Sequence, residues 1–282
     1  MKIKELLKVS VEELKKFEIE DVNLKVKILL SEVLGKGKEY LLIHDNDELS
    51  SEIVDVYNKM IERVKNGEPI QYILNKQEFM GLDFYVDKNV LIPQPDTENL
   101  VEEVIAISED IKKTKNEIRI LDMCTGSGAI AVSLAKYVEK TLIYASDISE
   151  NALKIAEENA IRNSVNVVFF KSDVFKNILL DFKFDIIVSN PPYIETKVIP
   201  ELSKEVRSEP ELALDGGEDG LKFYREIIKN AKDYLTEDGY LAFEIGYDQR
   251  ESVMTLLREN GYKNVYFKKD LSGNDRVVVG QK

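Results

Sequence analysis

Apolar residues near the start of the chain recur at helical spacing. In residues 6–17 and 22–33 each of them has another apolar residue three or four positions away, which is the spacing of one face of a helix. Gly35 follows the second run and predicts its end. A third run covers residues 50–65, and its first residue, Ser50, suits a helix N-cap. The pattern predicts a small helical bundle.

The pattern changes after residue 66. Residues 78–86 alternate in part between apolar and polar side chains, residues 87–89 have turn composition, and residues 90–92 form a short apolar run. This order predicts a β-hairpin. Pro93 and Pro95 then end it, and a helix is expected from Asp96 to about Ser108, because acidic residues favour a helix start.

From residue 117 onward, short apolar runs alternate with helical patterns. The runs predict strands at 118–121, 142–146, 167–170, 184–189, 240–245, 265–268 and 277–279. The patterns between them predict helices at 129–138, 150–162, 221–235 and 249–260. Such alternation is typical of a mostly parallel sheet with helices on both faces. Only a short loop joins the last two strands, so we expect that pair to be antiparallel.

Composition and charge narrow the chemistry. Hydrophobic residues make up 44% of the 282 positions, enough for a sizeable core. One cysteine and one histidine exclude an internal disulfide and make a zinc site improbable. The net charge of −13 argues against broad binding to a phosphate backbone, although acidity by itself can serve solubility alone. The chain shows neither a signal peptide nor an apolar membrane-spanning run.

A glycine-containing loop, Asp122-Met123-Cys124-Thr125-Gly126-Ser127-Gly128, joins the first strand of the alternating region to the helix after it. In a doubly wound sheet this turn lies at the carboxyl ends of the strands, where ligands bind. The helix N-terminus adds unpaired N–H groups. A loop of this kind is weak evidence by itself, because it is also compatible with a plain tight turn.

Acidic residues end the next two predicted strands. Asp147 can accept hydrogen bonds from two ribose hydroxyls. Asp173, followed by Val174, lies at the end of the third strand, beside the same cleft, where it could accept from an adenine amino group. Either carboxylate alone could be a helix cap. Suitable groups at three consecutive strand ends favour a nucleoside site.

The tetrapeptide Asn190-Pro191-Pro192-Tyr193 directly follows the apolar strand predicted at residues 184–189. Proline stops the strand and holds the preceding residue outside the helical region. The Asn190 side-chain oxygen and the Pro191 carbonyl are two acceptors for the protons of one NH₂ group. The Tyr193 ring offers a flat face to a planar amide or base. The alternative is a rigid turn with an asparagine cap.

With these motifs the chain resembles the HemK/PrmC family, which methylates the side-chain amide of a glutamine in class-1 peptide release factors. Further segments carry the resemblance: residues 67–74, 78–82, 91–98, 209–217, 219–221, 224–225 and 239–246. It implies a Rossmann-like class I methyltransferase fold with a mostly parallel seven-stranded sheet. It also implies a helical substrate-recognition domain at residues 1–66, a linker with a hairpin at 67–95 and the catalytic domain at 96–282.

The resemblance implies S-adenosyl-L-methionine as methyl donor, S-adenosyl-L-homocysteine as product and no metal. The expected cofactor-binding residues are Cys124, Thr125, Gly126, Ser127, Gly128, Asp147, Asp173, Val174 and Asn190. The expected substrate-binding residues are Asn190, Pro191, Pro192 and Tyr193, with Asn190, Pro191 and Tyr193 acting in catalysis. A cytoplasmic monomer is expected, with release factors as substrate and with neither direct nucleic-acid binding nor membrane binding.

The sequence departs from the family pattern at two positions and leaves two rival acceptors open. Gln94 stands where the family usually has arginine. Cys124 replaces the first glycine of the loop, which is acceptable if that position has negative φ. The same tetrapeptide would suit an enzyme that methylates a glutamine in a ribosomal protein. It would also suit a nucleic-acid adenine-N6 methyltransferase, although that class is expected to have a basic target-recognition region.

Overall fold

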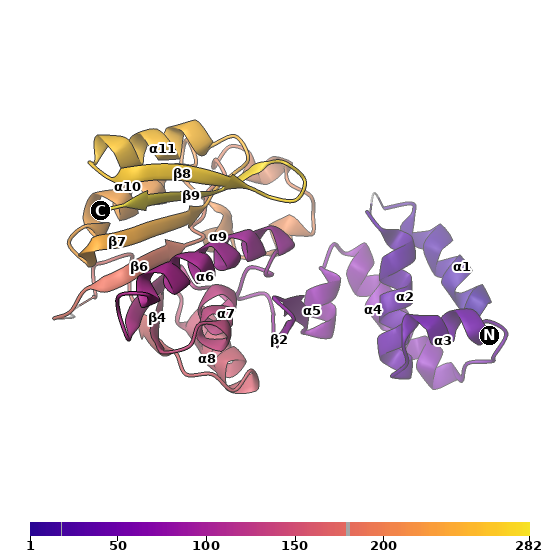
Figure 1. Cartoon of the computed structure of the whole chain (residues 1–282). Helices are drawn as coiled ribbons and strands as arrows, with labels where there is room; N and C mark the ends of the chain where they lie inside the picture. The colour runs from indigo at the N-terminus through magenta and orange to yellow at the C-terminus, as the bar shows by residue number, and fades with distance from the viewer. Residues whose placement is uncertain (18, 179–180) are drawn as a thin grey trace. The chain divides into compact units, whose positions relative to one another are not determined.

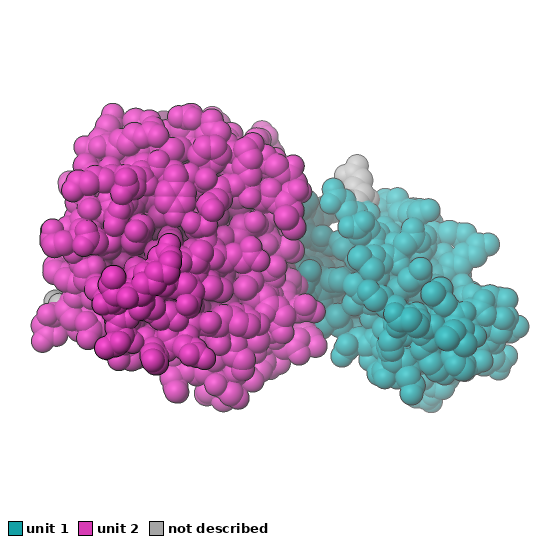
Figure 2. Space-filling model, viewed as in Figure 1, with its two compact units in different colours: residues 1–75, 203–208 teal, residues 76–202, 209–282 magenta. Residues whose placement is uncertain are grey.

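The computed structural model describes residues 1–17, 19–178 and 181–282. It divides into two compact units (Figure 2). Unit 1 contains Met1–Asn75 and Ser203–Ser208, and unit 2 contains Lys76–Leu202 and Glu209–Lys282. In these described ranges, no helix combines the length and the apolar character needed to cross a membrane. The predicted domains at residues 1–66, 67–95 and 96–282 stay a prediction.

Unit 1 is the helical bundle that the sequence predicts. Its helices are α1 Ile3–Leu14, α2 Val22–Leu34, α3 Lys38–Ile43, α4 Ser51–Lys65 and α5 Ile70–Leu74. Leu14, Leu29 and Tyr57 come from three of these helices and are completely buried together. The Ser50 hydroxyl caps α4 by accepting a hydrogen bond from the Ile53 N–H at 3.4 Å. The short helices α3 and α5 were not predicted, because so few residues carry no clear periodicity.

A short segment from the second half of the chain completes unit 1. Glu205 forms an ion pair with Lys25 of α2, whose side chain is only 11% exposed. The Ser208 hydroxyl donates to the Gly67 carbonyl at 3.0 Å. A Cβ atom on Gly67 would lie 2.7 Å from Lys204 Cβ, so this close approach requires glycine. The segment is therefore packed and paired as part of the bundle.

The hairpin is confirmed, but its predicted position is wrong. The strands are β1 Gln77–Phe79 and β2 Leu82–Phe84, paired antiparallel. The turn lies at Met80 and Gly81, with φ of 52° and 68°, and positive φ at both central residues is the requirement of a type I′ turn. Residues 87–89 also turn, because Asp87 Oδ1 accepts from the Asn89 N–H at 2.8 Å. The chain then continues without a second strand.

Unit 2 is built on a seven-stranded sheet with the order β5-β4-β3-β6-β7-β9-β8. The strands are β3 Ile118–Met123, β4 Thr141–Asp147, β5 Val168–Lys171, β6 Phe184–Ser189, β7 Leu235–Glu244, β8 Lys263–Lys269 and β9 Asp275–Gln281. The neighbours from β5 to β7 pair in parallel, and β9 pairs antiparallel with both β7 and β8. The predicted parallel sheet and its antiparallel end are both confirmed.

Helices cover both faces of this sheet (Figure 1). Helices α6 Glu98–Lys112, α7 Ala129–Tyr137 and α8 Glu150–Arg162 contact one another in sequence, and α10 Lys222–Ala231 contacts α11 Arg250–Glu259. The shorter helices of unit 2 are η1 Pro95–Thr97, η2 Ile199–Glu201 and α9 Glu211–Leu214, while η3 Val206–Ser208 belongs to unit 1. The helix expected from Asp96 to Ser108 is confirmed, with η1 forming its first turn.

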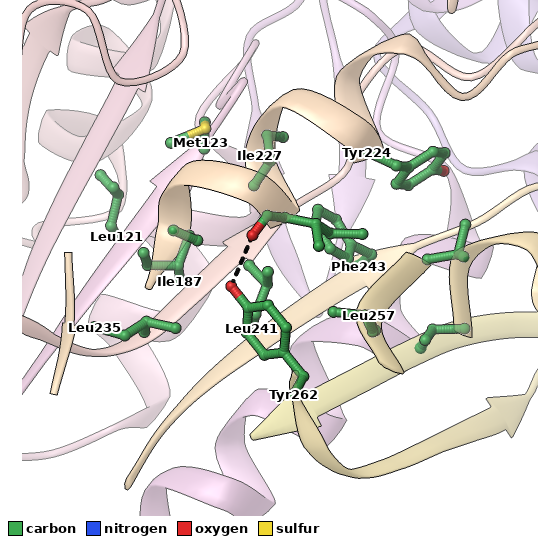
Figure 3. Packing of buried hydrophobic residues seen from close by; sticks show 14 of the residues in the cluster. Leu121, Met123, Ile187, Tyr224, Ile227, Leu235, Leu241, Phe243, Leu257 and Tyr262 are labelled. Atoms are coloured by element: carbon green, nitrogen blue, oxygen red, sulfur yellow. Dashed lines mark hydrogen bonds between the residues drawn. The ribbon is translucent and has the colours of Figure 1, made fainter. Parts of the chain in front are cut away.

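The core between the sheet and helices α10 and α11 is closely packed (Figure 3). Phe243 and Tyr224 pack edge to face with ring centroids 5.3 Å apart. The buried Tyr224 hydroxyl donates to the Glu244 carbonyl at 2.9 Å, and that of Tyr262 donates to the Ile228 carbonyl at 3.1 Å. Both phenols are thus satisfied, as buried polar groups must be. This packing fixes the carboxyl end of β7.

Parallel register brings the ends of the central strands to one level. Met123 at the end of β3 pairs with Ser146 of β4 on one side and with Ser189 of β6 on the other. The connections reverse direction at β3 and β6, because β4 and β5 lie beyond β3 while β7 lies beyond β6. Such a switch point is where open α/β sheets bind ligands.

Asn159 on α8 generates the first prediction. Its side chain is completely buried and bonds both the N–H and the carbonyl of Tyr85, at 2.7 and 3.0 Å, and the Ser127 carbonyl at 2.9 Å. We expect Asn159→Ala to lower the free energy of unfolding by about 3 kcal/mol, because buried backbone groups lose their partners. Urea unfolding measures this change.

Asn163 on the same helix provides the matched control. Its amide bonds the Asp83 carbonyl at 3.0 Å in a more exposed position. Asn163→Ala should cost less than about 1 kcal/mol, because water replaces the lost partner. Equal losses for the two variants would contradict the role given to Asn159.

Candidate active site

The loop after β3 is held by hydrogen bonds to a buried carboxyl group at its first residue. Asp122 Oδ2 accepts from the Thr125 hydroxyl at 2.6 Å and from the Ala131 N–H at 3.1 Å. Burial raises the pKa of Asp122 to about 7, and these two hydrogen bonds oppose the shift. Gly126 and Gly128 have φ of 54° and 81°, where glycine carries no Cβ penalty. The loop shape is therefore set before any ligand arrives.

Cys124 does not have the negative φ that was expected for a cysteine at this position of the loop. Its φ is +60°, in the left-handed region, whereas a cysteine was expected there only with negative φ. A residue with a Cβ in this region costs about 1–2 kcal/mol. Burial also raises the pKa of the Cys124 thiol, so the thiolate needed for a nucleophile is not formed near neutral pH.

Asp147 ends β4 directly beside this loop. Its Oδ2 accepts from the Gly126 N–H at 2.9 Å, and its Oδ1 accepts from the Ser149 N–H at 2.8 Å. Burial raises the pKa of Asp147, while these backbone hydrogen bonds oppose the shift. Each carboxylate oxygen retains a lone pair for a further donor. The carboxylate is thus fixed in place and able to accept from a ligand.

Asp173 and Val174 follow β5 on the same side of the sheet. Asp173 forms an ion pair with Lys176. Val174 has φ of +50°, which is a rare conformation for a β-branched residue. The Ser172 hydroxyl holds this turn by donating to the Val174 carbonyl at 2.7 Å. Strained backbone of this kind concentrates at functional sites.

The tetrapeptide after β6 is held by hydrogen bonds from both neighbouring strands. The Ser189 hydroxyl donates to the Met123 carbonyl at 2.7 Å. Asn190 Nδ2 donates to Thr97 Oγ1 at 3.3 Å, and the Tyr193 hydroxyl donates to Glu244 Oε1 at 3.4 Å. Because the amide nitrogen of Asn190 is paired with Thr97, its oxygen remains as an acceptor.

Two further segments hold the backbone where the tetrapeptide ends. The Gly216 N–H donates to the Ile194 carbonyl at 2.8 Å, and Gln249 Nε2 donates to the Tyr193 carbonyl at 3.0 Å. A Cβ atom on Gly216 would lie 2.7 Å from Tyr193 Cα, so this contact requires glycine. The 209–217 motif therefore holds the tetrapeptide in place.

These elements enclose a cavity of about 330 Å³ in unit 2, within the range of small-molecule sites. The predicted site residues that line it are Cys124, Gly126, Asp147, Asp173, Val174, Asn190 and Pro192. Those outside its lining are Thr125, Ser127, Gly128, Pro191 and Tyr193. The cavity thus joins the loop, the two strand-end carboxylates and the tetrapeptide. The binding roles of all twelve residues stay predictions.

Other lining residues were not identified from the sequence. They include Ile148, Phe223 of α10, and a wall formed by Pro210, Leu212 and Ala213. Ile148 could have been found, because it directly follows the strand-end Asp147. The wall lies in the 209–217 motif, which the resemblance included without giving it a role. Phe223 has no sequence signal beyond its place on an amphipathic helix.

Comparisons with known proteins show the family of the chain. Residues 106–215 match the family model described as methyltransferase small domain, and residues 5–74 match the PrmC N-terminal domain. The chain is 41% identical over 286 residues to the release factor glutamine methyltransferase of Clostridium botulinum, which covers all of both chains. It is also 41% identical to that of Fusobacterium nucleatum, over 97% of this chain and 77% of the relative.

The chain belongs to the release factor glutamine methyltransferase family. A solved methyltransferase from Pyrococcus furiosus has the same fold, with a TM-score of 0.53 over 80% of this chain and 98% of its own at 21% identity. The two family models and the 41% identical relatives show that the protein is a methyltransferase, and they confirm the family named from its motifs.

Cys124 generates the second prediction. Cys124→Gly and Cys124→Ala both remove the thiol, but only glycine fits a φ of +60° without strain. We expect the glycine variant to be more stable than the alanine variant by about 1 kcal/mol. Urea unfolding of the two variants measures the difference. An alanine variant of equal or greater stability would show that this position carries no strain.

Proposed function

We propose that the protein transfers a methyl group from S-adenosyl-L-methionine to the side-chain amide nitrogen of the glutamine in the GGQ motif of class-1 release factors. This modification would support translation termination in the cytoplasm. The observation that carries the proposal is the orientation of Asn190. Its nitrogen is hydrogen-bonded to Thr97 at 3.3 Å, so its oxygen is left to accept a hydrogen bond from an NH₂ group at the cavity.

The residues around the cavity fit the proposed methyl donor. Asp147, fixed by the N–H groups of Gly126 and Ser149, would accept from the ribose hydroxyls. Asp173 would accept from the adenine amino group, with Val174 and Ile148 supplying apolar contacts to the base. When bound, this donor supplies a methyl group already activated on a positive sulfur.

The protein would then act by holding a weak nucleophile. The lone pair of an amide nitrogen is delocalised into its carbonyl group. Asn190 Oδ1 and the Pro191 carbonyl would accept hydrogen bonds from the two N–H groups of this nitrogen, which favours the positive charge that develops on it. Holding the reacting atoms about 3–3.5 Å apart removes several kcal/mol of the barrier. The methylated nitrogen then loses one proton to solvent water and becomes the neutral secondary amide.

Tyr193 and the helical region complete the proposal. The Tyr193 ring packs against the core of unit 2, with its hydroxyl held by Glu244, and would fix the orientation of the substrate amide through its face. Residues 1–66 would recognise the release factor, and residues 67–95 would link them to the catalytic domain.

Incubation of the protein with a purified release factor and methyl-labelled cofactor tests the function. We expect label on the glutamine of the GGQ motif, located by mass spectrometry of the digested substrate. A ribosomal protein and a nucleic acid are incubated in parallel. Label on either of these, with none on the release factor, would contradict the proposal.

Substitutions at Asn190 and at Asp147 distinguish an effect on methyl transfer from an effect on cofactor binding. Asn190→Ala should lower kcat at least 100-fold, because one preorganised acceptor is lost, while the cofactor Kd stays within a few-fold. Asp147→Ala should raise the cofactor Kd by about 10- to 100-fold, as expected for lost hydrogen bonds to a charged group. Calorimetry and single-turnover rates measure the two effects. Near-normal kcat in the Asn190 variant would overturn its assignment.

A further inference from the structure

A buried carboxyl group lies directly behind the tetrapeptide. Glu244 ends β7 and is only 2% exposed. Its Oε1 accepts from the Tyr193 hydroxyl at 3.4 Å, and its Oε2 has no hydrogen-bond partner within the described part of the chain. Burying such a group costs free energy unless it is well paired. A hydrophobic residue here would cost the fold less, so stability alone does not explain Glu244.

Thr97 connects this carboxyl group to Asn190. Its hydroxyl oxygen accepts from Asn190 Nδ2 at 3.3 Å. A hydroxyl has only one proton to donate, and Thr97 is the neighbour that most lowers the pKa of the Glu244 carboxyl group. Thr97 itself is buried in η1. Thr97 is therefore hydrogen-bonded to Asn190 on the cavity side and acts on the charge of the Glu244 carboxyl group behind it.

We infer that Glu244 and Thr97 are positioning residues that set the direction of the Asn190 amide. This inference rests on the proposed function of Asn190. An ionised carboxylate can only accept, so Thr97 must donate to it. The Thr97 oxygen then accepts from the Asn190 nitrogen, and Asn190 Oδ1 faces the substrate. A protonated Glu244 could donate to Thr97, which would reverse these hydrogen bonds and turn the Asn190 nitrogen toward the substrate.

The surroundings of Glu244 bring its pKa close to neutral, so the direction of the Asn190 amide should change near pH 7. Burial raises the pKa of Glu244 to about 7, while Thr97 and Arg276 oppose the shift and Asp96 adds to it. The charged and titratable groups that face the carboxyl are Asp96, Tyr193, Tyr224 and Arg276. Arg276 is itself paired with Asp96 at 3.0 Å. As pH falls through 7, Glu244 gains a proton and the productive direction is lost.

The inference is tested first by kinetics on a release factor. Thr97→Val keeps the shape of the side chain but removes the hydroxyl, and we expect kcat to fall at least tenfold with the cofactor Kd unchanged within twofold. Thr97→Ser is the matched control and should retain kcat within about threefold. The wild-type kcat should fall below pH 7, whereas Glu244→Gln should have a lower kcat without this acid limb.

A second measurement needs no substrate. In protein labelled with ¹⁵N-asparagine, the Asn190 side-chain NH₂ signal, assigned by its loss in Asn190→Ala, should shift with a midpoint near pH 7. The shift should be absent in Glu244→Gln. A wild-type signal that does not titrate, or one that titrates equally in Glu244→Gln, would overturn the inference. In the second case another buried carboxyl group with a raised pKa, such as Asp122, would be responsible for the shift.

The two measurements distinguish this inference from the proposed function. Wild-type protein that shows the NMR titration but methylates no release factor would contradict the function and keep the positioning role. Active wild-type protein with an equally active Thr97→Val variant would contradict the positioning role and keep the function.

Discussion

Parallel pairing of β3 with β4 and β6 is the constraint on which the rest of the structure depends. Because Met123 pairs with both Ser146 and Ser189, the three strands end at one level. The glycine loop, the Asp147 carboxylate and the tetrapeptide therefore start from neighbouring points of one edge. A shift of one residue in any of these strands would turn its last side chain to the opposite face, and the cavity would lose one of its three sources of polar groups.

The sequence predicts the central elements well because their patterns are long and regular. The bounds of β6 and α8 agree with the predicted ranges 184–189 and 150–162, and both end at clear breakers or caps. The hairpin was misplaced because its turn, at Met80 and Gly81, lacks the polar residues typical of turns. Residues 90–92 have strand composition, but the Ile92 N–H bonds the distant Glu209 side chain at 2.8 Å, which no local pattern indicates.

The sequence predicted the site residues only where a polar side chain stands directly at the end of a predicted strand. Asp147, Asp173 and Asn190 stand at such positions and line the cavity. The wall at Leu212 and the support from Thr97 come from segments far away in the chain, and only the folded structure brings them to Asn190. Cys124 shows a different limit. The sequence stated the condition under which cysteine would fit, but backbone angles are a property of the folded loop.

The strap of residues 203–208 has a consequence for how the chain folds during synthesis. Lys25 in α2 has a largely buried side chain whose partner is Glu205, and a buried cation without its partner is strongly unfavourable. Helices α1 to α5 are synthesised first and can begin to fold. Unit 1 is complete only after strands β3 to β6 have also been synthesised, because residues 203–208 follow them in the chain. It is a discontinuous unit, and residues 1–75 on their own would lack the carboxylate that pairs with Lys25.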